Sequence, residues 1–213
     1  VSHDLKAPLR GIDGYSQLLV DDYGDRLDAD GRQFVQRIRQ GVQQMGALIS
    51  DLLEYSRMER RDMAQEPVAL RPLVEQILEA YQADIEAHGV QVHLQMEPLT
   101  LALDREGISV VLRNLIGNAL KFSADSHPPT LEIGARSAPG RRILWVRDNG
   151  VGFDMKYHDR MFGIFQRLHR AEEFPGTGVG LALVAKAVQR MGGCVRGESS
   201  PGAGATFYLE FPE

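Results

Sequence analysis

The sequence contains very little cysteine and no long hydrophobic run, and both shortages narrow the class of protein. Its 213 residues include one cysteine, Cys194, which excludes an internal disulfide and a zinc cluster of several thiolates. No apolar run approaches the roughly 18 residues that a bilayer-spanning helix needs. These features are typical of a protein in the reducing cytoplasm, where we expect Cys194 to be a small core residue.

The sequence has no excess of positive charge, and we expect no secretory leader at its start. The formal net charge of −5 argues against a broad surface for nucleic acid. A polyanionic ligand such as ATP would therefore need local cations or a metal ion. The chain begins inside a patterned segment with no helix cap before it, so we expect it to be a piece of a longer protein.

Apolar residues at helical spacing dominate the first part of the chain. Two segments, separated by a short polar stretch with helix-capping residues at 27–30, share this rhythm. Their apolar positions are Leu5, Leu9, Ile12 and Leu19 in the first segment, and Phe34, Ile38, Met45, Leu48, Leu52 and Tyr55 in the second. The pattern predicts an antiparallel helical hairpin. Its wide apolar seam would be covered by dimerisation into a four-helix bundle or, alternatively, by packing of a monomeric hairpin on the rest of the chain.

A change of pattern near Pro67 predicts a domain boundary. Residues 57–66 are charged and show little periodicity, so we expect a first domain at 1–66 and a second at 67–213. The second domain has helical patterns at 70–88, 104–122 and 179–191, and strand patterns at 90–96, 99–103, 131–135, 143–146, 194–197 and 206–211. We expect the strand at 99–103 to pair with the one at 90–96. Helices and strands mix without βαβ repetition, which predicts helices on one face of a mixed sheet.

Three polar residues share one face of the helix predicted at 104–122. Asn114, Asn118 and Lys121 are spaced i, i+4 and i+7, so their side chains lie on one side of the helix. Carboxamide oxygens are suitable ligands for a hydrated Mg²⁺, and an ammonium group suits phosphate oxygens. The opposite face is apolar and predicts core positions at Ile108, Leu112, Leu115 and Ile116. The alternative is a polar face exposed to solvent.

Two glycine-rich stretches follow. Residues 148–153, Asp-Asn-Gly-Val-Gly-Phe, come directly after a strand, and glycine lets the backbone approach a ligand closely. A buried Asp148 could accept a hydrogen bond from an exocyclic amine such as that of adenine, although a hairpin turn is the alternative. Residues 176–181, Gly-Thr-Gly-Val-Gly-Leu, open a helix whose free N–H groups and dipole favour phosphate; a flexible linker is the alternative.

Residues 154–175, between these stretches, have the composition of a long loop. This segment contains Phe-Gly-Ile-Phe at 162–165 and three potential cations, Arg167, His169 and Arg170. A long segment of this kind is typical of a lid over a ligand, in which Arg167 could stabilise charge on a transferring phosphoryl group. The alternative is an ordinary surface loop with a solvated Arg167.

The chain opens on a histidine beside a carboxylate, in Ser-His-Asp-Leu-Lys-Ala-Pro-Leu at 2–9. Taken alone, such a pair is usually a solvated surface pair. With the four stretches above and Pro-Gly-Ala-Gly-Ala-Thr-Phe at 201–207, however, six motifs follow one order. Over nearly its whole length the chain resembles the transmitter core of a sensor histidine kinase. The amino-acid sequence of residues 162–169 is also similar to that of phytochrome-type and PAS-linked kinases.

This resemblance implies a fold and a reaction. The fold is a helical hairpin that dimerises into a four-helix bundle, followed by an α+β two-layer sandwich of the Bergerat type that binds ATP. His3 would receive the γ-phosphate on a ring nitrogen, and Asp4 would take up the proton. Attack requires the neutral imidazole, and a neighbouring carboxylate favours the positive charge that develops on it. The phosphoryl group would then pass to an aspartate on the receiver domain of a response regulator.

The resemblance also implies a nucleotide site. Asn114 and Asn118 would hold Mg²⁺, Lys121 and Arg167 would contact phosphates, and Asp148 would bind adenine. The other residues implied for nucleotide binding are Gly150, Gly152, Phe162, Gly176, Thr177, Gly178, Gly180, Leu181 and Thr206. The expected partners are a second copy of the chain, a response regulator and an upstream sensor domain, with no nucleic acid, in the cytoplasm.

One position departs from the family pattern. Many members carry Thr or Asn four residues after the histidine, where it positions water for dephosphorylation of the regulator, and this chain has Ala7. Phosphatase activity is therefore in doubt. Two other classes compete: a gyrase-, mismatch-repair- or chaperone-type ATPase, and a non-catalytic scaffold. The first uses a general-base glutamate where this chain has Asn114, and the second would require a broken motif, which the sequence does not contain.

Overall fold

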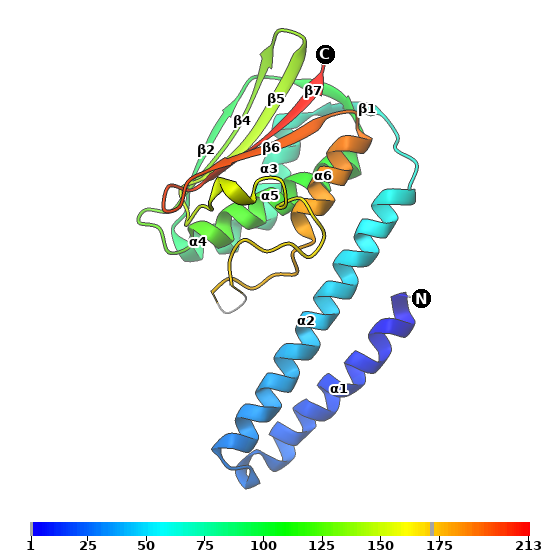
Figure 1. The fold of residues 1–213 in the computed structure, drawn as a ribbon, viewed down its shortest axis with the longest axis vertical. Helices are drawn as coiled ribbons and strands as arrows, with labels where there is room; N and C mark the ends of the chain where they lie inside the picture. The colour runs from blue at the N-terminus through cyan, green and yellow to red at the C-terminus, as the bar shows by residue number, and fades with distance from the viewer. Residues whose placement is uncertain (1, 171–172) are drawn as a thin grey trace. The chain divides into compact units, whose positions relative to one another are not determined.

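The computed structural model describes residues 2–170 and 173–213, with side chains from Asp4 onward. The chain forms two compact units, Val1–Arg57 and Met58–Glu213. Figure 1 shows a pair of long helices followed by a sheet and its helices. No helix in the described parts of the chain is long and apolar enough to cross a membrane.

The first unit is the helical hairpin that the apolar spacing predicts. Its elements are α1 (Ser2–Tyr23), the short 3₁₀ helix η1 (Gly24–Arg26) and α2 (Ala29–Arg60), whose last turn belongs to the second unit. Asp28 accepts a hydrogen bond from the Gly31 N–H at 2.7 Å, as expected of a capping residue. Val35 and Val42 are buried between the helices. Most of the other large apolar side chains of the hairpin are exposed in the single chain.

The second unit is built on a five-stranded sheet in the order β2-β4-β5-β7-β6. Its strands are β2 (Gln91–Met96), β4 (Thr130–Ala138), β5 (Arg141–Asp148), β6 (Cys194–Ser199) and β7 (Ala205–Pro212). β2 and β4 are parallel, whereas the other neighbours are antiparallel, so the sheet is mixed as predicted. A separate two-stranded sheet joins β1 (Glu66–Ala69) to β3 (Thr100–Leu103).

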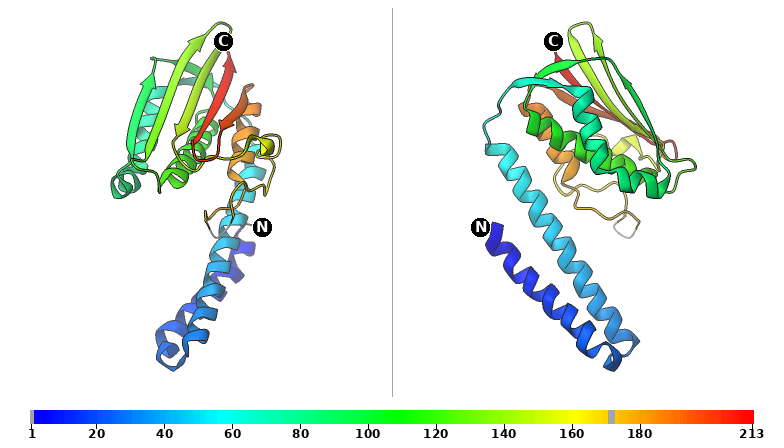
Figure 2. Two further views of the ribbon diagram at one scale, coloured as in Figure 1. Left: turned by 60° about the vertical axis from the view of Figure 1, so that its left-hand side comes forward. Right: turned by 180° about the vertical axis from the view of Figure 1, so that it is seen from behind.

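The helices of the second unit cover one face of the five-stranded sheet, as Figure 2 shows from two sides. They are α3 (Leu70–Ala80), α4 (Gln82–His88), α5 (Arg105–Ser123) and α6 (Gly180–Arg190), with a 3₁₀ turn η2 (Met155–Tyr157). The four apolar positions predicted for the inner face of α5 are all fully buried. The core therefore lies between α5, α6 and the sheet, which makes α5 a fixed platform for whatever its outer face carries.

Three expectations about these elements are wrong. The strand at 99–103 is β3, which pairs with β1 in the separate two-stranded sheet. β2 pairs instead with β4 in the five-stranded sheet. The helix expected at 70–88 is divided at Tyr81, whose hydroxyl donates to the Arg113 carbonyl of α5 at 3.2 Å, so a tertiary contact overrides the continuous helical pattern. Cys194 is exposed at the start of β6 rather than buried in the core.

Candidate nucleotide-binding site

The outer face of α5 carries the three polar residues that the sequence places together. Asn114, Asn118 and Lys121 are all half-buried on this face, while the opposite side of the helix is in the core. The helix begins at a strong cap, because Asp104 accepts a hydrogen bond from the Gly107 N–H at 2.6 Å. The three side chains are therefore mounted on a helix that is held both at its start and along its buried face.

Asn114 is oriented by its own helix. Its Nδ2 donates to the Val110 carbonyl at 2.9 Å, which leaves Oδ1 directed to the start of α6. A Cβ on Gly180, the first residue of α6, would lie 2.7 Å from this oxygen. Only glycine at 180 leaves the Asn114 oxygen in place, so the amide of α5 and the glycine-rich start of α6 form one surface.

Asp148 closes β5 in a buried position. Its carboxylate is 6% exposed and accepts hydrogen bonds from the backbone N–H of Gly150, at 2.8 Å, and of Ala205. Burial raises the pKa of Asp148 to about 6, against the lowering effect of these two hydrogen bonds. A carboxylate is acceptor-only when ionised, so its chemistry suits the amino group of adenine.

Residues 148–153 do not form a hairpin turn, which was the alternative. A hairpin there would pair β5 with the next strand along the chain, β6, but β5 pairs with β4 and β7. Gly152 has φ +60°, and a Cβ there would lie 2.1 Å from the Ser200 carbonyl. Asn149 accepts from the Thr130 N–H at 2.9 Å and donates to the Pro128 carbonyl at 2.8 Å. Sequence reasoning missed this second role of the motif, which ties the turn to the start of β4.

The lid segment brings a second cation to the site. Arg167 donates to the carbonyl groups of Phe174 at 2.6 Å and Gly176 at 2.8 Å, and Lys121 donates to the carbonyl of Pro175 at 3.3 Å. Burial and, secondarily, the positive charge of Arg167 lower the pKa of Lys121. Two cations thus converge on one short stretch of backbone, which argues against the alternative of a solvated Arg167.

Aromatic side chains that the sequence did not indicate hold this part of the lid. The rings of Phe122, His169 and Phe174 form a cluster with centroid distances of 5.3, 5.1 and 5.2 Å. Phe122 follows Lys121 near the end of α5, and Nζ of Lys121 lies 4.1 Å from the centre of the Phe122 ring. Because Phe122 is about fifty residues from the other two members, no local spacing could have predicted the cluster.

The remaining predicted residues are distributed around these groups. Gly176, Thr177, Gly178 and Leu181 lie in the loop and first turn at the N-terminus of α6, where the Thr177 hydroxyl accepts from the Val179 N–H at 3.4 Å. Phe162 is half-buried in the lid. The loop thus brings backbone N–H groups to the start of a helix, an arrangement that favours phosphate.

Thr206 is the predicted residue that the structure does not bring to the site. It lies on β7 opposite Arg147, next to Ala205, which is opposite Asp148. Successive side chains of a strand point to opposite faces, so the Thr206 side chain projects away from the face that Asp148 occupies. The residue at this position that serves the site is Ala205, through its backbone N–H.

The predicted phosphoacceptor region lies in the first unit. His3 and Asp4 are both in the first turn of α1, and Asp4 is exposed. The side chain of His3 lies outside the described residues. Ala7 follows His3 by one turn of the same helix.

Comparisons with known proteins agree with this geometry. A family model described as "Histidine kinase-, DNA gyrase B-, and HSP90-like ATPase" matches residues 103–213, and one described as "His Kinase A (phospho-acceptor) domain" matches residues 1–61. Cyanobacterial phytochrome B of Nostoc sp. is 40% identical over 211 residues, which are 98% of this chain and 28% of the relative. The phytochrome-like protein Cph1 of Synechocystis sp. is 35% identical over 211 residues, with coverages of 99% and 28%. The chain thus spans little more than a quarter of these relatives.

Solved structures are similar to this chain over its whole length. The crystal structure of full-length ShkA in complex with AMPPNP has a TM-score of 0.73 and 28% sequence identity, covering 99% of this chain and 44% of that one. The histidine kinase AdeS of Acinetobacter baumannii, at 20% identity and a TM-score of 0.70 over 100% of this chain and 98% of that one, shares the fold. The chain therefore belongs to the histidine kinase-, DNA gyrase B- and HSP90-like ATPase family, and with its phosphoacceptor domain it is the transmitter core of a sensor histidine kinase.

Proposed function

We propose that this chain is an ATP-dependent autokinase that phosphorylates His3 and passes the phosphoryl group to an aspartate of a response regulator. The observation that supports this most directly is the position of Asn114 and Lys121 on α5, beside the glycine-rich start of α6 and the lid cation Arg167. Amide oxygens are suitable ligands for Mg²⁺, and two cations and the N–H groups at the start of a helix are suitable partners for phosphate oxygens. Together they match what a magnesium-bound triphosphate requires.

The residues present suit ATP and Mg²⁺. Asp148 would hold the adenine amino group, and Gly152 lets the turn after it pack against the backbone of Ser200 and Gly204, whose carbonyl oxygens a Cβ there would meet. Asn114 and Asn118 would hold Mg²⁺, which neutralises phosphate charge when bound and keeps several of its waters. Lys121 and Arg167 would exchange backbone carbonyls for phosphate oxygens, which form stronger, charge-assisted hydrogen bonds.

In the proposed reaction, the unprotonated ring nitrogen of His3 forms a bond to the γ-phosphorus while the bond from phosphorus to the leaving oxygen of ADP breaks. The proton on the other ring nitrogen passes to Asp4, the adjacent carboxylate on α1. Arg167 would offset the charge on the transferring group. Transfer from His3 to the regulator's aspartate then restores the free histidine.

We further propose that residues 1–66 act as the dimerisation and phosphotransfer domain and residues 67–213 as the catalytic domain, in the cytoplasm. The support for a homodimer is the amount of apolar surface on the hairpin. Its exposed large apolar side chains are Leu5, Ile12, Tyr15, Leu18, Leu19, Val20, Tyr23, Phe34, Ile38, Met45 and Leu52. So many exposed apolar side chains on two helices are typical of a surface that pairs into a four-helix bundle.

The experiment is incubation of the full chain with γ-labelled ATP and Mg²⁺, followed by acid and alkali treatment of the labelled protein. We expect an acid-labile, alkali-stable label on the unmodified chain and none on His3→Gln, while both bind nucleotide. Equal labelling of the two proteins would show that His3 is not the acceptor. ATP turnover without any labelled histidine would favour the simple ATPase, and absence of nucleotide binding would favour the scaffold.

A further inference from the structure

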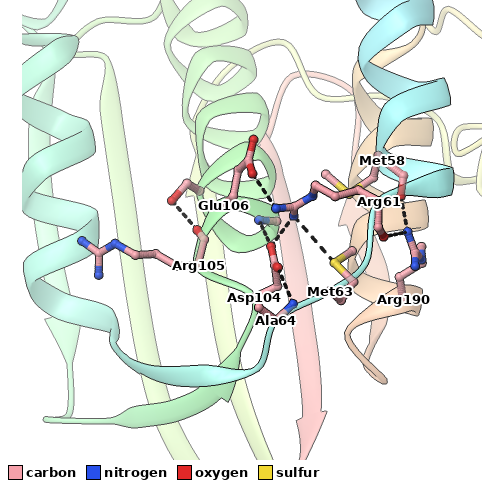
Figure 3. A network of polar contacts seen from close by, with 10 residues as sticks. Met58, Arg61, Met63, Ala64, Asp104, Arg105, Glu106 and Arg190 are labelled. Carbon is pink, nitrogen blue, oxygen red and sulfur yellow. Dashed lines mark hydrogen bonds and ion pairs between the residues drawn. The ribbon is translucent and has the colours of Figure 1, made fainter.

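A cluster of charged side chains connects the end of α2 to both helices of the nucleotide site. We call it the junction cluster; it consists of Arg61, Asp104, Glu106, Arg190 and the carbonyl groups of Met58 and Arg61 (Figure 3). All of these residues belong to the second unit, although α2 itself begins in the first. The proposed reaction uses none of them.

One side of the junction cluster is an arginine on a buried carboxylate. The guanidinium of Arg61 forms ion pairs with Asp104 and with the exposed Glu106. Asp104 is 3% exposed and also accepts hydrogen bonds from the N–H of Ala64, at 3.0 Å, and of Gly107. Asp104 is thus both the N-cap of α5 and the attachment point of residues 61–64.

The charge on Asp104 depends on these partners. Burial by itself would raise the pKa of Asp104, but hydrogen bonds from Gly107, Arg61 and Ala64, with the Arg61 charge, hold it below its ordinary value. Asp104 is therefore a carboxylate at neutral pH. Without the Arg61 guanidinium, a buried negative charge at the start of α5 would lose its cation, a change that is costly when the charge is out of contact with water.

The other side of the junction cluster comes from α6. Arg190, the last residue of that helix, donates to the carbonyl of Met58 at 2.5 Å and to that of Arg61 at 2.7 Å. The last carbonyls of a helix have no partner within it, and a cation is favoured there by the helix dipole. One turn earlier, Lys186 pairs with Glu59 at 3.0 Å. The end of α2 is therefore attached to α6 by two side chains.

The two attachment points lie on the two helices that carry the proposed phosphate site. α5 bears Asn114, Asn118 and Lys121, and α6 begins at Gly180 against the Asn114 oxygen. α5 and α6 pack together in the core, so a ligand bound to the outer face of α5 and the start of α6 stabilises the same pair of helices that holds Asp104 and Arg190. Residues 58–64 connect these two groups.

We propose that Arg61 is a positioning residue that couples nucleotide binding to the ordering of residues 58–64, the end of α2 and the segment that follows it. This inference rests on the proposed function, because it takes the α5 and α6 residues to be the nucleotide site. By thermodynamic reciprocity, a nucleotide that stabilises the junction cluster is itself bound more tightly when the cluster is intact.

The test uses the full chain and Arg61→Met, which keeps much of the aliphatic stem and removes the charge. Arg60→Met is the matched control, since Arg60 is the exposed neighbour at the end of α2. Binding of a fluorescent ATP analogue with Mg²⁺ is measured first for each protein. Amide hydrogen exchange of residues 58–64 is then compared with and without saturating Mg²⁺ and AMPPNP.

We expect nucleotide to slow exchange at 58–64 in the unmodified chain and in Arg60→Met, but not in Arg61→Met. Nucleotide affinity of Arg61→Met should fall by about fivefold or more, the lower end of ordinary coupling between sites. A purely structural role would instead lower the melting temperature and leave the nucleotide-dependent protection in place. If Arg61→Met does not fold, Arg61→Lys, which keeps the charge but loses the forked contact to both carboxylates, should show a reduced effect.

Protection that persists in Arg61→Met, or that is absent from the unmodified chain while nucleotide is bound, would overturn this inference. Either result would leave the nucleotide site intact, because binding is measured separately. Absence of binding by the unmodified chain would instead contradict the proposed function. The two failures are therefore distinguishable in one set of samples.

Discussion

Asp148 gives the sharpest quantitative prediction, because one carboxylate should affect stability and affinity in opposite directions. Its pKa rises from 3.8 to about 6 on folding, because burial disfavours the charged form. The folded state then binds a proton that the unfolded state has already released, so the contribution of Asp148 to stability is present at low pH and is lost as the pH rises toward 6. At neutral pH the ionised carboxylate is a destabilising group, by about 3 kcal/mol for a shift of about two units.

The change in the free energy of unfolding over an accessible pH range follows from the same linkage between protonation and folding. For pKa values of 3.8 and about 6, the free energy of unfolding should gain about 1.4 kcal/mol from Asp148 between pH 7.5 and pH 5.0. Asp148→Asn cannot titrate, so this gain should be missing from the variant. The difference in unfolding free energy between the two proteins cancels the titration of groups that they share.

Nucleotide affinity should change in the other direction. If only the ionised carboxylate binds the adenine amino group, about one molecule in eleven is competent at pH 5.0, and affinity should fall by about tenfold. Asp148→Asn should bind more weakly at pH 7.5 and show no such loss on acidification. Because ATP phosphates also titrate, the comparison that matters is again the difference between the two proteins.

The assay is urea unfolding without nucleotide, followed by the fluorescence of Trp145, the one tryptophan of the chain, which lies on the same strand as Asp148. Affinity is measured at the same pH values with a fluorescent ATP analogue. Parallel pH profiles of stability for the two proteins would refute the argument from burial. An affinity that rises on acidification would refute the assignment of adenine to Asp148.

Three further changes test the rest of the site. Asn118→Asp, which places a carboxylate against phosphates, should lower Mg·ATP affinity by tenfold or more in a nucleotide titration, and unchanged affinity would show that the metal-binding face is misplaced. Gly180→Ala should also weaken binding, because its Cβ would lie 2.7 Å from the Asn114 oxygen, and an unaltered affinity would mean that this oxygen is not used. Ala7→Thr should raise the weak phosphatase activity expected of this chain, since one positioning hydrogen bond is worth roughly 10²–10³ in rate. The measurement is ADP-independent decay of phosphorylated regulator with His3→Gln as a parallel control, and rapid decay with unmodified Ala7 would contradict the prediction.

The sequence was most informative where structure depends on local periodicity. The four buried positions of α5 and the shared face of Asn114, Asn118 and Lys121 follow from helix geometry alone, and both were predicted. The hairpin was predicted for the same reason. Pairing between strands is not local, however: alternation identifies a strand at 99–103 without specifying that its neighbour is β1 rather than β2.

The position of Thr206 on the other face of β7 could not be predicted for a related reason. A hydroxyl beside a glycine motif is chemically reasonable for a nucleotide site, but its usefulness depends on which face of β7 it occupies. That face is set by the alignment of β7 with β5, in which Asp148 is opposite Ala205 and Arg147 is opposite Thr206. A shift of one residue would exchange their roles, so composition alone could not decide between them.

The division of the chain shows the same limit for charged residues. The sequence predicts the domain boundary at Pro67, because the charged segment 57–66 before it shows little periodicity. In the structure the second compact unit already begins at Met58, whose side chain is 4% exposed. The partner of Arg61 is Asp104, 43 residues further along the chain, and each looks like an ordinary surface charge by itself. An ion pair of this kind can be recognised only when the fold brings its two halves together, here an arginine at the end of α2 and the buried carboxylate that caps α5.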